Sequence, residues 1–169
     1  MQKKSLHRLT NASLCAALYA AMTLALPMLS YGQVQFRISE VLTLLPLFSP
    51  TFVWGLPVGC LIANLFSPLG WMDLVFGTSA TLLAAVLTRA FRHVKFGKLP
   101  ILSMLMPVIC NTVFIGAEIG LLTENATPLT YVYSGLSVGA GELVVCLGLG
   151  IPFYLLIQRS RLSDVLRKA

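Results

Sequence analysis

Runs of about 20 apolar residues recur along this chain, which is the length that a helix needs to cross the hydrocarbon core of a bilayer. Only 11% of the residues are charged, against about 25% in soluble domains. We therefore predict an all-α, polytopic membrane protein. Residues 1–169 are expected to form one integral membrane domain.

Basic residues gather in three places: the N-terminus, the segment 89–98 and the C-terminus. Loops on the cytoplasmic side of a membrane protein carry an excess of Lys and Arg. We expect both termini and the segment 89–98 to be cytoplasmic, and the first apolar run to be a retained helix rather than a signal peptide. The net charge of +6 is then a topology signal, and no nucleic-acid partner is expected.

The apolar stretches divide into six predicted transmembrane helices, at residues 11–29, 40–48, 51–66, 71–88, 101–122 and 131–157. The division of residues 38–66 rests on parity, because an even number of crossings must separate the N-terminus from the segment 89–98. The second helix is short: about 9 residues at 1.5 Å each span only ~13 Å. Its ends must therefore be shielded by protein.

Small residues repeat every four positions along the first helix, in two neighbouring stripes: Ala12, Ala16 and Ala20, then Ala17, Ala21 and Ala25. Such stripes let another helix backbone approach closely in lipid. Internal packing and docking of a partner subunit are both compatible with this pattern.

One polar stretch interrupts the apolar pattern, SYGQVQFRISEVLTLLP at residues 30–46. It holds Gln33, Gln35, Arg37, Ser39 and Glu40 within eight residues. No other part of the chain is similar, and we predict that this stretch forms one wall of a small-molecule site at the outer mouth of the bundle.

Further acids lie within or beside the apolar helices: Asp73, Glu118 and Glu142. A charge inside a membrane segment costs about 2.5–3.5 kcal/mol on insertion scales, and such residues usually carry function. Plainer roles stay open. Glu40 and Asp73 suit the positive end of a helix dipole, and Glu118 and Glu142 are able to fix packing through hydrogen bonds.

Under the predicted topology, these acids share the outer half with amides and aromatic rings. Carboxylates accept paired N–H donors, and aromatic faces stack on planar rings. The set favours a flat, nitrogen-rich, neutral or cationic heterocycle. The candidate substrate-binding residues are Tyr31, Gln33, Phe36, Arg37, Glu40, Asn64, Trp71, Asp73, Asn111, Glu118 and Glu142.

The sequence lacks the motifs of several catalytic classes. There is no GxxxxGK[ST] phosphate loop and no HExxH. The two histidines, His7 and His93, lie in basic segments away from the acids. We therefore predict no catalytic residue, no metal site and no enzymatic activity.

Three motifs carry a resemblance to a known family: YGQVQFRISEVLTLLP at residues 31–46, GLPVGCLIANLFSPLGWMDLVFGTSATLLAA at 55–85, and GAGE at 139–142. In these motifs the chain resembles the QueT family of substrate-binding subunits (S components) of energy-coupling factor (ECF) transporters. The resemblance covers most of the chain.

The resemblance implies a six-helix S component in the bacterial cytoplasmic membrane, which captures a queuosine precursor (a 7-deazaguanine base) at the outer face. Its implied partners are a transmembrane coupling subunit and two ATPase subunits. ATP would be used by those ATPases, and no cofactor would be bound by this chain. The resemblance also implies that Ala12, Ala16 and Ala20 dock on the coupling subunit.

Three other functions compete with this one. A stand-alone ion- or proton-coupled carrier would use Glu118 and Glu142 as relay acids. A membrane enzyme acting on a lipid or peptide is disfavoured, because both histidines lie in basic segments away from the acids. An assembly factor for another membrane complex would bind no small ligand.

Overall fold

The computed structural model describes residues 2–32 and 34–168, with side chains for 5–32 and 34–166. The protein is all-helical, as predicted: within the described residues, the only β pairing is one isolated bridge between Phe96 and Leu99. The elements are α1 (Gln2–Ala25), α2 (Pro27–Ser30), η1 (Ile38–Leu47), α3 (Phe52–Asn64), α4 (Trp71–Ala90), α5 (Ile101–Leu122), α6 (Pro128–Leu143), η2 (Val144–Leu149), α7 (Gly150–Arg159) and α8 (Leu162–Lys168).

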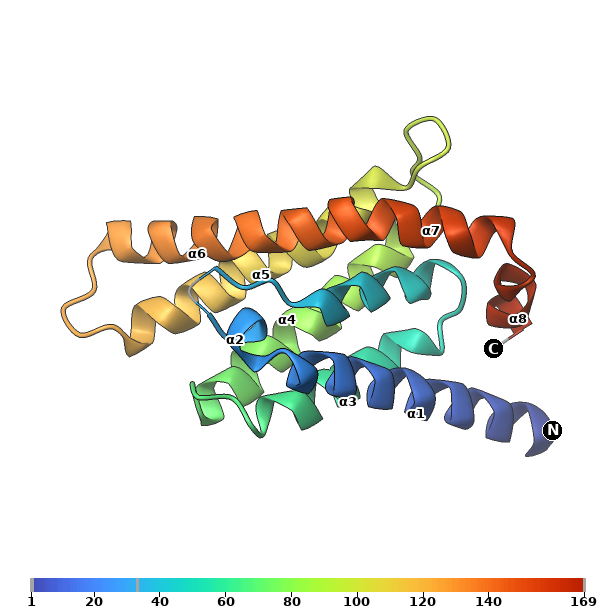
Figure 1. Cartoon of the computed structure of the whole chain (residues 1–169), viewed down its shortest axis with the longest axis horizontal. Helices are drawn as coiled ribbons and strands as arrows, with labels where there is room; N and C mark the ends of the chain where they lie inside the picture. Colours follow the sequence, from blue (N-terminus) through green and yellow to red (C-terminus); the bar gives the residue numbers. More distant parts are fainter. Residues whose placement is uncertain (1, 33, 169) are drawn as a thin grey trace.

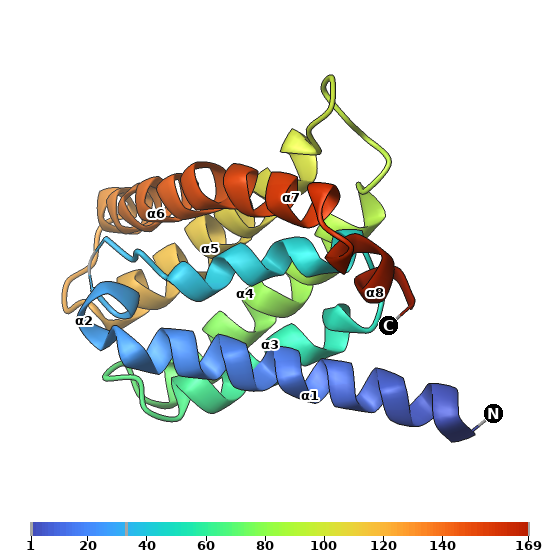
Figure 2. The ribbon, with the colours of Figure 1, turned by 45° about the vertical axis from the view of Figure 1, so that its right-hand side comes forward.

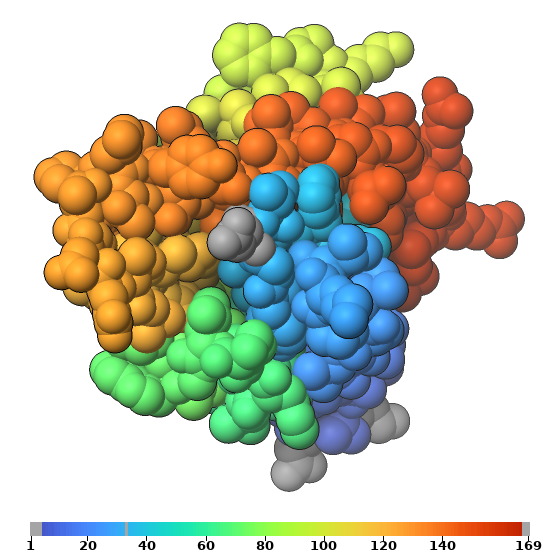
Figure 3. Space-filling view, turned by 60° about the vertical axis from the view of Figure 1, so that its left-hand side comes forward, coloured from blue at the N-terminus to red at the C-terminus, as the bar shows by residue number. Residues whose placement is uncertain are grey.

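The main elements run back and forth along one long axis (Figure 1). The two termini and the segment 91–100 lie at the same end of the bundle, and Figure 2 shows the same arrangement after rotation. We call this the basic end. The segments 26–32, 34–36, 65–70 and 123–127 lie at the other end, which we call the acidic end and which faces the viewer in Figure 3.

Among the described residues, three helices are long and apolar enough to cross a membrane: Trp71–Ala90, Ile101–Leu122 and the continuous run Pro128–Arg159. Two further apolar helices, Ile38–Leu47 and Phe52–Asn64, are shorter. The protein is therefore a helical membrane protein, and the count of six crossings stays a prediction.

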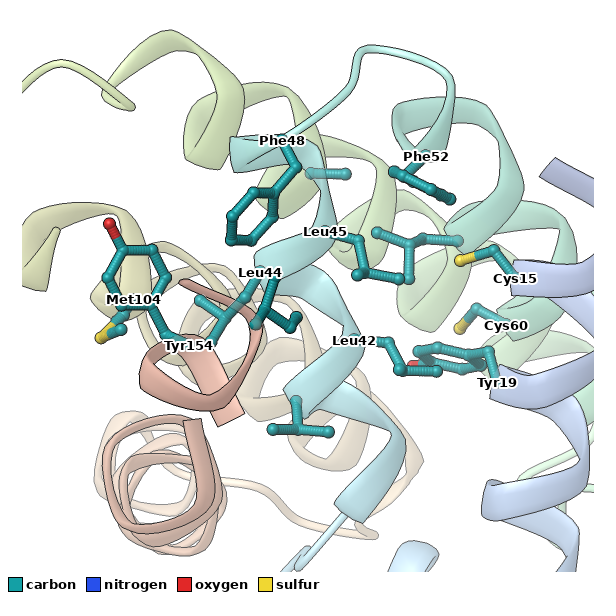
Figure 4. Packing of buried hydrophobic residues seen from close by; sticks show 14 residues of the cluster. Cys15, Tyr19, Leu42, Leu44, Leu45, Phe48, Phe52, Cys60, Met104 and Tyr154 are labelled. Atoms are coloured by element: carbon teal, nitrogen blue, oxygen red, sulfur yellow. The ribbon is translucent and has the colours of Figure 1, made fainter. Parts of the chain in front are cut away.

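The short second helix differs from its prediction in kind. Instead of an α-helix over 40–48, η1 is a 3-10 helix of 10 residues. At about 2.0 Å per residue it extends roughly 20 Å, farther than the predicted α-helix. Every residue from Ser39 to Pro46 is buried. The slimmer 3-10 helix thus occupies the middle of the bundle, where Figure 4 shows Leu42 beside the ring of Tyr19.

α1 begins at Gln2, well before the predicted start at residue 11. Proline and capping residues explain two of the other shifted helix ends. α1 stops at Ala25 rather than continuing to residue 29, because Pro27 disfavours helical backbone at Leu26. α6 begins at Pro128, three residues before the predicted start, because Thr127 and Thr130 form a reciprocal capping box. The C-terminal segment also forms a helix, α8, that the sequence did not predict.

The first helix packs on α3 through small residues on both sides. A Cβ atom added at Gly55 would lie 2.6 Å from the carbonyl oxygen of Ala12. One added at Gly59 would lie 2.6 Å from that of Ala16 and 2.8 Å from Cβ of Tyr19. The GxxxG pair of α3 and the first alanine stripe of α1 therefore form one close helix contact.

We predict that Gly59→Ala destabilises the protein by about 1–3 kcal/mol, the usual cost of an added methyl group in a full interior. Thermal unfolding of the purified protein in detergent measures the change. Gly148→Ala is the matched control, because the nearest atom to its new methyl group would be 4.0 Å away. Equal unfolding temperatures for the two variants would contradict the close contact of α1 and α3.

Candidate functional site

Four carboxyl groups are buried in the half of the bundle toward the acidic end, each on a different element. Glu40 lies in the first turn of η1 and Asp73 in the first turn of α4. Glu118 lies near the end of α5 and Glu142 near the end of α6. All four are 0% exposed. Acids are almost never fully buried unless they are paired, so this group is the candidate site.

Arg37 lies within electrostatic reach of all four acids. Its Nη2 atom is 3.7 Å from Oδ2 of Asp73, and both side chains are buried. Its guanidinium carbon lies 5.5 Å from the ring centroid of Tyr31, a cation–π contact. Arg37 and the four acids are called the acidic cluster below.

A second set of contacts fixes Asp73 and the helices around it. Asn64 donates through Nδ2 to the carbonyl oxygen of Asp73 at 2.8 Å, and also contacts the sulfur of Cys60 at 3.4 Å. Thr81 donates to the same sulfur at 3.2 Å. A Cβ atom at Gly77 would lie 2.5 Å from Nδ2 of Asn64. The glycine thus makes room for the contact between α3 and α4.

Glu40 and Glu142 have neighbours from α1, α5 and η2. The hydroxyl of Tyr19 donates to Oε1 of Glu40. Cys146 contacts Oε2 of Glu142 at 3.8 Å. Asn111 lies close enough to both Glu40 and Glu142 to interact with their carboxyl groups. One amide therefore lies near two acids that come from different helices.

Many polar atoms of this region are buried without a hydrogen-bond partner in the protein. They include both carboxylate oxygens of Glu118 and of Asp73, and one oxygen each from Glu40, Glu142, Asn64 and Asn111. Donors are fewer: Nε and Nη2 of Arg37 and Nε2 of Gln35. Buried polar atoms are normally satisfied, so this excess of acceptors suits a ligand that brings N–H donors. Among the described residues, no group of three or more His, Cys, Asp or Glu is placed to hold a metal ion.

The remaining predicted residues differ in how deeply they are buried. Tyr31 is half-buried and donates its hydroxyl proton to the carbonyl oxygen of Ala63 at 2.8 Å. Phe36 is also half-buried. Trp71 is 69% exposed, so the structure does not bring it into the acidic cluster. Gln33 lies outside the described residues.

Sequence reasoning missed several residues at the cluster, among them Tyr19, which donates to Glu40, Cys60, which contacts Arg37, and Thr81, which donates to Cys60. All three lie inside apolar helices, where an isolated Tyr, Cys or Thr is an ordinary packing residue. Tyr19 carried a weak signal, because its face of α1 also bears the small residues that let α3 approach. Cys60 carried none.

The alanine stripes of α1 are used differently from one another. Ala16 and Ala20 are buried, and Ala12 and Ala16 contact α3. A partner helix therefore cannot reach Ala16 and Ala20 in this structure. The second stripe is exposed, and its members are Ala17, Ala21 and Ala25.

A family model described as QueT transporter matches residues 9–159. The chain belongs to the QueT transporter family. The match extends from α1 to the end of α7, so it includes every member of the acidic cluster. The family predicted from the three motifs is thus confirmed.

The Queuosine precursor transporter QueT of Lactococcus lactis subsp. cremoris (strain MG1363) is 33% identical to this chain over 84 residues. The aligned part is 48% of this chain and 49% of the relative, so the match spans about half of the relative's length. The family and the relative are both named as transporters, in agreement with the prediction that the chain is not an enzyme. No solved structure matches the chain.

We predict that Arg37→Gln destabilises the protein by about 3–5 kcal/mol, because it leaves Asp73 buried opposite a neutral side chain. The double variant Arg37→Gln/Asp73→Asn removes both charges and should be more stable than the single variant. Chemical unfolding in detergent measures both. Arg161→Gln removes an exposed cation and serves as the control. A single variant as stable as the control would show that the ion pair does not hold η1 against α4.

Proposed function

We propose that this chain is the membrane-embedded substrate-binding subunit of an ATP-driven ECF importer, and that it captures a queuosine precursor, a 7-deazaguanine base, at the acidic end. The observation that carries the proposal is the acidic cluster. The cluster is buried, and its four acids lie on four different helical elements. Most of its atoms without a hydrogen-bond partner are acceptors. Membership in the QueT transporter family supports the substrate class.

The chemistry of the cluster matches a donor-rich, cationic ligand. Four acids surround the single guanidinium of Arg37. The amino group and ring N–H of a deazaguanine are adjacent donors that one carboxylate is able to accept together. An aminomethyl substituent adds a cation for a second acid. We propose that Glu142, which lies beside Asn111, binds the ring edge. Glu118, whose two oxygens have no hydrogen-bond partner, is the proposed partner of the cation.

The distribution of charge supports capture at the outer face. The basic end carries the Lys and Arg clusters that mark cytoplasmic segments, and the acidic cluster lies toward the opposite end. A ligand entering at the acidic end therefore comes from outside the cell. Both termini are then cytoplasmic.

ATP-driven transport needs partner subunits that hydrolyse ATP, because the sequence of this chain contains no phosphate-binding loop. We assign this role to a transmembrane coupling subunit and two ATPase subunits. The exposed second stripe of α1, with Ala17, Ala21 and Ala25, offers the small-residue surface on which a partner helix packs.

One observation favours a second function, a stand-alone proton-coupled carrier. Glu118 and Glu142 are buried with unpartnered oxygens, and acids in membrane interiors also relay protons. That carrier would take up substrate without partner subunits, and a protonophore would abolish the uptake.

Binding to the purified chain tests the favoured proposal. We expect 7-aminomethyl-7-deazaguanine to bind one-to-one, and at least about tenfold more tightly than the neutral 7-cyano base, the ratio given by ~1.4 kcal/mol of ion pairing. Glu142→Gln should weaken the binding of both bases. Glu118→Gln should weaken mainly the binding of the aminomethyl base.

Glu124→Gln is the matched control for this titration, because Glu124 is an exposed acid at the acidic end. It should bind both bases as the unaltered chain does. Tight binding of thiamin or riboflavin instead would contradict the assignment of a deazaguanine as the substrate. No saturable binding by a folded sample would overturn capture by this chain.

Docking is tested separately, by co-purification with the coupling and ATPase subunits. Ala21→Leu should reduce recovery of the complex severalfold, because a bulky side chain keeps the partner backbone at a distance. Ala140→Leu makes the same change at an exposed alanine of α6 and should leave recovery unchanged. Equal recovery with both variants would remove the second stripe from the interface.

A further inference from the structure

A crevice of about 230 Å³ opens at the basic end, between the segment 91–100, the end of η1 and α7. Its inner part is formed by Phe48 and Tyr154, which are both buried. Its outer part carries Arg92, His93 and Lys95, of which His93 and Lys95 are exposed. None of the described residues that line the crevice is acidic.

Packing and hydrogen bonds preform the inner part of this crevice. The rings of Phe48 and Tyr154 pack with their centroids 5.9 Å apart. Gln158, which also lines the crevice, donates through Nε2 to the hydroxyl oxygen of Tyr154 at 2.8 Å. The end of η1 and the face of α7 therefore meet in one fixed arrangement.

Two arginines fix the basic side. Arg89 donates through Nη1 to the carbonyl oxygens of Pro46 and Leu47, at 3.0 and 3.3 Å. Arg92 donates through Nη1 to the carbonyl oxygen of Arg89 at 3.0 Å. A guanidinium carries five N–H donors in a fork that matches phosphate oxygens. Arg92 is thus anchored through one nitrogen at the edge of the crevice.

Two apolar side chains alternate with the basic ones in the same segment. Val94 is 41% exposed and Phe96 is 68% exposed, on either side of Lys95. An exposed aromatic residue beside cations is typical of a loop that lies at the level of lipid headgroups. The loop follows α4, one of the helices that are long and apolar enough to cross a membrane.

We infer that this crevice binds the phosphate group of an anionic phospholipid headgroup. Arg92 and Lys95 neutralise the phosphate, and Phe96 enters the headgroup region beside it. Basic pockets between transmembrane helices on the cytoplasmic side are suited to such headgroups. The exposed apolar side chains favour a lipid over a free phosphate ion, although both carry the same chemistry.

The test uses the full chain in a neutral detergent, titrated with dioctanoyl phosphatidylglycerol and followed by native mass spectrometry. Dioctanoyl phosphatidylcholine and glycerol phosphate are titrated in parallel. We expect one saturable phosphatidylglycerol site that Arg92→Gln/Lys95→Gln weakens roughly 30-fold, since each basic residue contributes about a fivefold effect near an anionic surface. Circular dichroism checks that each variant is folded.

The matched control is Lys98→Gln/Arg161→Gln, which removes two exposed charges at the same end outside the crevice. It should change the affinity less than about twofold. Equal loss in both double variants, or equal binding of phosphatidylcholine, would overturn the site. Tight binding of glycerol phosphate alone would support a phosphate site and contradict a lipid as its ligand. Impaired partner assembly without any change in lipid binding would instead assign the crevice to a protein surface.

Discussion

The ion pair between Arg37 and Asp73 is the interaction on which the rest of the structure depends. It brings the start of η1 and the start of α4 together in an interior where an unpaired charge is very unfavourable. Tyr19 then joins α1 to η1, and Asn64 joins α3 to α4. In lipid, where apolar contact alone drives helix association weakly, such polar contacts define which helices are neighbours.

The same contacts leave the cluster incomplete. Glu118 has no hydrogen-bond partner for either oxygen, and Glu40 and Glu142 each lack one for a single oxygen. An arrangement that only stabilised the fold would pair these atoms within the protein. The network therefore combines contacts that hold the helices, at Arg37, Asp73 and Tyr19, with carboxylate oxygens that have no hydrogen-bond partner in the protein.

Much of this could be predicted from the sequence, and the reason differs between residues. The acids were identifiable because charge is rare and costly within apolar runs. The contribution of Tyr19 and Cys60 could not be predicted, because those residue types are common in ordinary helix interiors. The 3-10 form of η1 also could not be predicted, since its hydrogen-bond register depends on how closely neighbouring helices approach. The alanine stripes indicated close packing, but only the structure separates the stripe that faces α3 from the exposed one.

The π-helical segment η2 has a consequence for the phase of the last long helix. Glu142 and Tyr154 are separated by twelve residues, and at about 100° per residue a regular α-helix would turn their side chains roughly 120° apart. A π-helical segment takes up one extra residue, which turns the following helix back by about 100°. Both side chains are in fact buried, at 0% and 3% exposure. One uninterrupted helix therefore lines the acidic cluster with its first half and the basic crevice with its second.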